Sequence, residues 1–178
     1  MRGLLTAAVG MAVLGAVVTA TTSYAAQATL SCPRVVRAGQ QFTAELTVDV
    51  STTPLGAYSL TITFDPRVVT IASVAGGSTA EFSGPPTTST ATPGTTNVSA
   101  FQSASLDSPK GVVSVAKVTF KLMSTAATTA AVGLTANHVF DTNAVAIVPA
   151  TGTGCTVVTG SSPHPRRAHR PPLRRAGL

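Results

Sequence analysis

Two stretches of the chain alternate strictly between apolar and polar residues. In residues 41–50 (QFTAELTVDV) every second side chain from Phe42 onward is apolar, and Thr, Glu or Asp stands between. Residues 58–65 (YSLTITFD) repeat the pattern up to Phe64, and a Pro-Leu-Gly loop joins the two stretches into one unit. A period of two is typical of a half-buried β-strand. Because each strand needs one dry and one wet face, we expect an antiparallel sheet packed on a second sheet.

A third alternation covers residues 112–122 (VVSVAKVTFKL). We place Val112 on the inner face together with the even-numbered residues from Ala116 onward. Val113, Val115 and the residues at odd positions after them are then expected on the outer face. The stretch predicts one long strand.

Shorter β segments fill much of the remaining chain. They are expected at 29–36 with an interruption at Pro33, and at 68–74, 97–103, 132–136, 144–148 and 155–158. The stretch 83–99 is dense in Pro, Gly, Ser and Thr, which predicts a long exposed loop. No window predicts an amphipathic helix. The fold class indicated is all-β, a single jelly-roll or immunoglobulin-like sandwich of about nine strands.

The first residues predict export. Residues 1–25 contain one Arg, a long apolar run and then small residues, as in a secretory signal peptide cleaved after Ala25 or Ala26. A retained membrane anchor is the alternative, but the apolar run is rich in Ala and Gly and soon breaks into Thr and Ser. We expect a mature protein that is secreted or at the cell surface, with no transmembrane segment after cleavage.

The formal charge of +6 does not lie in the predicted domain. Between residues 27 and 160, expected to form that domain, six basic residues balance six acidic ones, so we expect no nucleic-acid binding there. The excess comes from Arg2 and from five arginines in residues 161–178, a tail expected to be disordered. That tail is either a solvated end or an electrostatic contact to anionic envelope polymers.

Cys32 and Cys155 are the two cysteines of the chain. Because an exported protein meets an oxidising environment, we expect a disulfide between them that ties the first strand to the last. Closing a loop of this length contributes about 4 to 5 kcal/mol in the chain-entropy model. Lipidation of Cys32 is the alternative, but Leu30 stands one place away from the usual lipobox position.

No catalytic constellation is visible in the sequence. The acidic residues are scattered, Asp65 before Pro66 is typical of a turn, and His138 with Asp141 makes only an incomplete metal pair. We therefore assign no catalytic residue, no metal ligand and no cofactor, and we expect that the protein is not an enzyme.

Four passages, taken in order, carry a family resemblance. They are AGQQFTAELTVDV, LGAYSLTITFDPRVVTIASV with its Phe64-Asp65-Pro66 corner, KGVVSVAKVTFKL and NHVFDTNAVAIV. Together they resemble a cohesin domain, the receptor module of cellulosome-type assemblies, over roughly Ala28 to Val158. That family belongs to a larger group that also holds cellulose-binding sandwiches.

The resemblance implies a nine-stranded sandwich that binds a protein partner on one sheet face, usually the dockerin module of another secreted protein in a polysaccharide-degrading assembly. Counted back from Phe64, the Asn and Asp that contact the partner in the family correspond to Ala57 and Ser59 here. The fold is therefore expected and the partner stays open. The candidate contacts are Ala57, Ser59, Thr61 and Thr63, with Gln102 and Ser103 on a neighbouring strand.

Polysaccharide binding is the main alternative function, because related sandwiches hold glycans on a row of aromatic rings. The chain has no Trp, and parity assigns Phe42, Phe64 and Phe120 to the core, which leaves Tyr58 as a poor platform. Protein binding therefore ranks above glycan binding. A purely structural surface protein is the third possibility.

Overall fold

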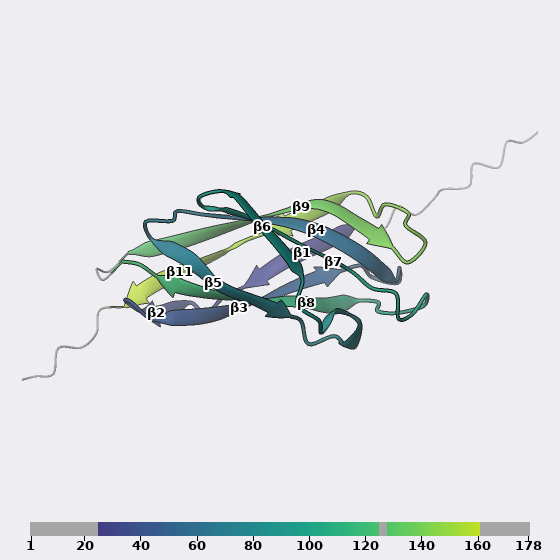
Figure 1. Cartoon of the computed structure of the whole chain (residues 1–178), viewed down its shortest axis with the longest axis horizontal. Coiled ribbons are helices and arrows are strands. Elements are labelled where there is room, and N and C mark those ends of the chain that lie inside the picture. Colours follow the sequence, from purple (N-terminus) through teal and green to yellow (C-terminus); the bar gives the residue numbers. More distant parts are fainter. Residues whose placement is uncertain (1–24, 125–127, 161–178) are drawn as a thin grey trace, which may run out of the picture.

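The computed structural model describes residues 25–124 and 128–160, so the predicted tail and all but the last residue of the predicted signal peptide lie outside the described residues. The strands are β1 (Ala26–Ser31), β2 (Val35–Arg37), β3 (Gln41–Asp49), β4 (Leu55–Phe64), β5 (Val69–Gly76), β6 (Thr87–Thr92), β7 (Thr95–Phe101), β8 (Val112–Leu122), β9 (Thr129–Asp141), β10 (Ala150–Thr153) and β11 (Cys155–Gly160), with one 3₁₀ turn at Ala80–Phe82. They form a five-stranded sheet, β10-β1-β3-β8-β5, and a six-stranded sheet, β2-β11-β9-β4-β7-β6. The two sheets pack as a sandwich (Figure 1), which confirms the predicted all-β class.

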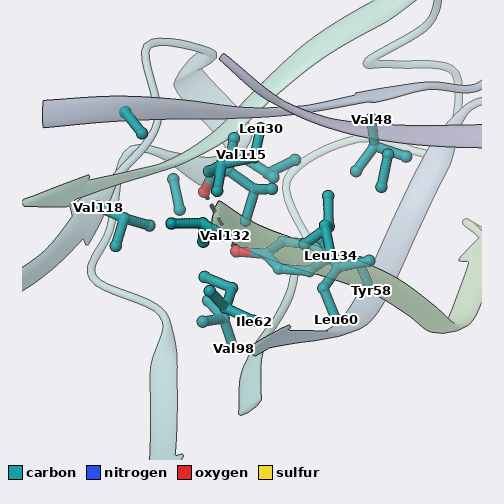
Figure 2. Packing of buried hydrophobic residues seen from close by; sticks show 14 of the residues in the cluster. Leu30, Val48, Tyr58, Leu60, Ile62, Val98, Val115, Val118, Val132 and Leu134 are labelled. Atoms are coloured by element: carbon teal, nitrogen blue, oxygen red, sulfur yellow. Dashed lines mark hydrogen bonds between the residues drawn. The ribbon is translucent and has the colours of Figure 1, made fainter. Parts of the chain in front are cut away.

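The core lies between the two sheets and is made almost wholly of aliphatic side chains (Figure 2). Full burial of one such side chain contributes about 1.5 to 3 kcal/mol. The Phe42 and Phe120 rings stack with centroids 5.2 Å apart, and the Phe64 ring meets the edge of Phe120 at 6.3 Å. The three phenylalanines assigned by parity to the inner face thus pack together.

The two strands predicted from residues 41–50 and 58–65, β3 and β4, lie in different sheets. β3 pairs with β1 and β8, whereas β4 pairs with β7 and β9, so the segment between them crosses the sandwich. A turn makes the crossing, in which the Asp49 carboxylate accepts a hydrogen bond from the Ser51 amide at 2.9 Å. Each strand has one dry and one wet face as predicted, but the dry faces point at one another across the core.

The interruption at Pro33 is a second crossing between sheets. β1 belongs to the five-stranded sheet, and β2 pairs in parallel with β11 in the other. Cys32, just after β1, forms a disulfide with Cys155 at the start of β11, with the two Cα atoms 5.9 Å apart. The predicted disulfide is therefore present, and it connects the two sheets.

The inner and outer assignments at the start of β8 are wrong. Val112 is 69% exposed, whereas Val113 and Val115 are buried. The reason is a β-bulge: Leu46 pairs with Ala116 but the next residue, Thr47, pairs with Ser114. Val115 is thus an extra residue, and the parity before it is inverted.

The predicted exposed loop at 83–99 is wrong from Thr87 onward, whereas the strand predicted at 97–103 is present as part of β7. Residues 87–92 and 95–101 form the β6–β7 hairpin at one edge of the six-stranded sheet, and every residue of β6 is exposed. Gly94 adopts a φ of +81° in the connecting turn, and its carbonyl accepts a hydrogen bond from the Phe64 amide at 2.8 Å. The Thr-rich composition that suggested a loop also suits an exposed edge strand.

The predicted strand at 144–148 is reduced to a single bridge between Phe140 and Ala146. Ala144 has a positive φ of 60°, because it lies in a turn after β9 where its amide donates to the Asp141 carbonyl. The next strand, β10, begins only at Ala150 and pairs in parallel with β1.

Candidate partner-binding face

The four predicted contact residues of β4 share one outer face. Tyr58, Leu60 and Ile62 point into the core and are nearly or fully buried, and the residues between them point outward. Strand alternation therefore places Ala57, Ser59, Thr61 and Thr63 in a row along the middle of the six-stranded sheet.

The strands on either side of β4 complete this face. Ala57 lies opposite Phe101 on β7 and Phe140 on β9. Further along, β4 pairs with Asn97 and Ser99 of β7 on one side and with Thr135 and His138 of β9 on the other. The β4 face is defined here as the following outward residues: Ala57, Ser59, Thr61, Thr63, Asn97, Ser99, Phe101, Thr135, Asn137, His138 and Phe140.

A short hydrogen-bond relay crosses the centre of the β4 face. The Asn137 side-chain amide donates to the Thr61 hydroxyl at 2.7 Å, and that hydroxyl donates to Asn97 Oδ1 at 2.7 Å. The relay fixes three side chains from three strands. It leaves Asn97 Nδ2 and Asn137 Oδ1 without a partner among the described residues, so the face presents one amide donor group and one carbonyl acceptor to solvent.

The β4 face carries no formal charge. The strands β4, β6, β7 and β9 contain no Lys or Arg, and Asp141, the final residue of β9, is their one acidic residue. The outer face of the other sheet differs, because Glu45 on β3 stands opposite Lys117 on β8. The two faces of the sandwich therefore suit partners of different chemistry.

An aromatic hollow lies where β7 and β9 reach the end of the β4 face. It encloses about 280 Å³ and is lined by Gly56, Ala57, Phe101, Gln102, Phe140, Asp141, Thr142 and Ala144. Phe101 is 79% exposed on one side of it. On the other side the Phe140 ring stacks on His138, with centroids 5.9 Å apart and planes 19° apart.

Gln102 and Ser103 lie just beyond β7, at the same end of the sandwich. The two N–H protons of the Gln102 amide are shared among the carbonyls of Leu55, Ser105 and Ser108, and its oxygen accepts from the amides of Ala104 and Ser105. This side chain therefore shapes the loop beside the hollow. Ser103 is exposed in that loop.

The remaining polar residues that the sequence singled out have structural partners. The Asp65 carboxylate hydrogen-bonds the side chain and backbone amide of Arg67, which lowers the pKa of Asp65. Asp141 Oδ1 accepts hydrogen bonds from the amides of Asn143 and Val145, so it closes the turn after β9. Within residues 25–124 and 128–160 no group of three or more His, Cys, Asp or Glu side chains could hold a metal ion.

Sequence reasoning missed several members of the β4 face. The alternation of β7, in which Val98 is buried, was enough to place Asn97 and Phe101 on the outer side. The members from β9 gave no such signal. A register shift there puts Asn137 and His138 both outward, since Leu60 pairs with Ala136 but Ser59 pairs with His138.

In the part of the chain that the structure describes, no helix has the length and apolar character to cross a membrane.

A family model described as the cohesin domain matches residues 26–158. No curated protein has a matching sequence. Among solved structures, the seventh type I cohesin of ScaB from Pseudobacteroides cellulosolvens has a TM-score of 0.65 at 13% identity, covering 83% of this chain and 99% of its own. The sixth cohesin of scaffoldin B from Acetivibrio cellulolyticus, solved in complex with a dockerin, has a TM-score of 0.63 at 17% identity, covering 76% and 99%.

A non-cellulosomal cohesin from the archaeon Archaeoglobus fulgidus has a TM-score of 0.59 at 13% identity, covering 76% of this chain and 91% of its own. At these identities the solved structures show a common fold, and the family model adds the family itself. Cohesin domains are non-catalytic protein-binding modules. This chain belongs to the cohesin domain family.

Proposed function

We propose that this protein is a secreted, non-catalytic cohesin module that binds a protein partner through the β4 face. The observation that carries the proposal is the continuity of this face: side chains from β7, β4 and β9 form one uncharged surface joined by the Asn137–Thr61–Asn97 relay. Such a surface offers both hydrogen bonds and apolar contact, the combination found in specific protein interfaces.

The partner proposed is a dockerin-like module. Cohesins of this fold have been solved with dockerins. The resemblance places Ala57 and Ser59 where the family has polar contacts, but Asn97 and Asn137 lie on the strands on either side and direct amide groups outward. We infer that these two amides supply the polar contacts from displaced positions, which supports a dockerin-like partner with altered specificity.

The proposed location is outside the cell. Both cysteines of the chain are joined in a disulfide, which is typical of oxidising compartments, and residues 1–25 have the pattern of a signal peptide. A connection with polysaccharide-degrading assemblies follows from the family resemblance. Direct glycan binding has less support, because Tyr58 is buried and the outward aromatic rings gather at one end of the face instead of forming a row.

The proposal is tested by capture from the secreted proteins of the producing organism. Immobilised protein is compared with the variants Ser59→Arg and Thr61→Arg, which place a long charged side chain in the middle of the β4 face. Thr43→Arg is the matched control, since Thr43 is an exposed threonine on β3 in the opposite sheet. We expect capture by the wild type and by Thr43→Arg only. Equal capture by all four proteins would reject the face, and depletion on insoluble glycans instead would favour the polysaccharide alternative.

A further inference from the structure

We propose that the aromatic hollow is an anchor site for one aliphatic side chain, of the size of Leu, Ile or Met, from the protein partner. The inference rests on the proposed function, and it names the chemistry of the partner at one position. It concerns the end of the β4 face where Ala57 meets Phe101 and Phe140.

The backbone of this chain builds the hollow at a register shift. Leu55 pairs with Asp141 and Ala57 pairs with Phe140, so Gly56 has no direct partner and lies against the end of β9. A Cβ at Gly56 would overlap the Asp141 carbonyl oxygen, which means that only glycine permits this close approach. The small Ala57 side chain beside it leaves the space between the two phenylalanine rings open.

Most of the polar groups that line the hollow already make hydrogen bonds within the protein. The Gln102 amide lies within hydrogen-bond distance of five backbone groups, four in its own loop and one at Leu55. Asp141 Oδ1 accepts two backbone amides, and the Thr142 hydroxyl donates to the Leu106 carbonyl at 2.7 Å. A sugar or another polar ligand would find few partners here, so burying it would be unfavourable. An aliphatic side chain gives up no hydrogen bond to water when it enters the hollow.

The hollow is small for a ligand site and has room for one aliphatic side chain. Its volume of about 280 Å³ lies just below the range of roughly 300 to 1,000 Å³ typical of small-molecule sites. Its rim is apolar as well. Leu106 accepts the hydrogen bond from Thr142 through its carbonyl, and its side chain is 70% exposed. Val145 follows Ala144 in the chain and is 60% exposed. An aromatic site with an apolar rim, in which Asp141 is the one charged residue of the lining and is held by backbone amides, has the features of an interface anchor at the end of a larger face.

A titration followed by amide NMR tests the anchor site without the partner. The probes are N-acetyl-leucine N-methylamide and, as the polar control, N-acetyl-serine N-methylamide. We expect saturable shifts from the leucine probe at the amides of Ala57, Phe101, Phe140 and Ala144, and at least tenfold weaker binding of the serine probe. Ala57→Leu, which fills the hollow, should abolish the leucine shifts, whereas Thr63→Leu on the same strand should keep them.

The anchor proposal is rejected if the leucine probe gives no saturable shifts there, or if Ala57→Leu binds it as the wild type does. The spectrum of each variant reports whether it is folded. The Thr61→Arg variant separates the two proposals, because it should bind the leucine probe normally and still lose the protein partner. Normal probe binding combined with unchanged partner capture in Thr61→Arg would reject the proposed function alone.

Discussion

Tyr58 connects the two sheets at the level of a single residue. Its ring extends from β4 into the core, where it is 2% exposed and lies at 5.6 Å from the Phe82 ring. Its hydroxyl donates to the Val115 carbonyl on β8 at 3.2 Å, as the dashed line in Figure 2 shows. The acceptor is the bulged residue of β8, so this bond satisfies a carbonyl where the sheet is irregular. Tyr58, which the sequence left as a poor platform for a glycan, therefore has a structural role in the core.

Burial raises the pKa of Tyr58 above its ordinary value of about 10. The pKa of Tyr58 is higher in the folded state than in the unfolded state. The contribution of this residue to the free energy of unfolding is therefore fully present below about pH 10 and is lost as the pH rises above it. We expect the free energy of unfolding to fall between about pH 10 and pH 12, with a slope of up to about 1.4 kcal/mol per pH unit from this residue.

Urea unfolding of the wild type and of Tyr58→Phe at several pH values checks this prediction. At neutral pH the variant should be less stable by about 1 kcal/mol, because the Val115 carbonyl loses its donor. Above pH 10 the difference should shrink or reverse. Parallel pH curves for the two proteins would show that Tyr58 does not ionise on unfolding.

Gly56 is the second residue with a specific structural role, because the aromatic hollow depends on its close approach to β9. Gly56→Ala would place a Cβ against the Asp141 backbone, and neither strand can move without disturbing the sheet. We expect a loss of about 1 to 3 kcal/mol in the free energy of unfolding. Gly84→Ala is the control, since a Cβ there has nothing within 4 Å, and it should be neutral within about 0.5 kcal/mol. A neutral Gly56→Ala would mean that the close approach is not required.

At the scale of elements, regular alternation predicted the strands well. β3, and β4 from Ala57 onward, follow the expected pattern, because every second side chain meets the core. β8 was located correctly, but its bulge cannot be read from side-chain type, since valine suits both faces. The strand predicted at 97–103 corresponds to β7, whereas β6 was missed because Pro, Gly and Thr indicate a loop equally well. Which strands pair with which depends on packing between segments that are far apart in the sequence.

The β8 bulge makes a direct prediction. Val115→Asp would bury a carboxylate in the core, and we expect it to prevent stable folding or to cost at least about 4 kcal/mol. Val112→Asp changes the same residue type in the same strand at a 69% exposed position, so it should cost less than about 0.5 kcal/mol. Thermal unfolding of both variants measures which of the two substitutions costs more stability. Strict alternation without the bulge predicts the opposite order, with Val112→Asp as the more destabilising change.

The disulfide connects two elements from opposite sheets across 123 residues of sequence. In the chain-entropy model a loop of this length contributes about 5 kcal/mol. We expect the Cys32→Ala, Cys155→Ala double variant to lose a comparable amount, measured by urea unfolding under oxidising conditions. The wild type in excess reductant should match the double variant. If reduction leaves the wild type unchanged, the bond has little influence on stability.

At the scale of the whole molecule, the five-stranded sheet has a mixed-charge outer face, whereas the β4 face on the other sheet is uncharged. The β4 row of the uncharged face could be predicted from alternation and from the Phe64-Asp65-Pro66 corner. The contributions from β7 and β9 could not, because they depend on the register between strands that lie far apart in the sequence. The aromatic hollow is likewise formed only when three segments meet. The centre of the proposed face was therefore visible in the sequence, and its edges and the proposed anchor hollow were not.

The measurement that tests the binding face most directly is the dissociation constant of the captured partner, determined by calorimetry for the wild type, Thr61→Arg and Thr43→Arg. A charge buried without a counterion at an interface costs about 2 kcal/mol or more, so Thr61→Arg should weaken binding by roughly 30-fold or more. Thr43→Arg, on the opposite sheet, should bind as the wild type does. Wild-type affinity in Thr61→Arg, or a loss confined to Thr43→Arg, would contradict the assignment of the β4 face.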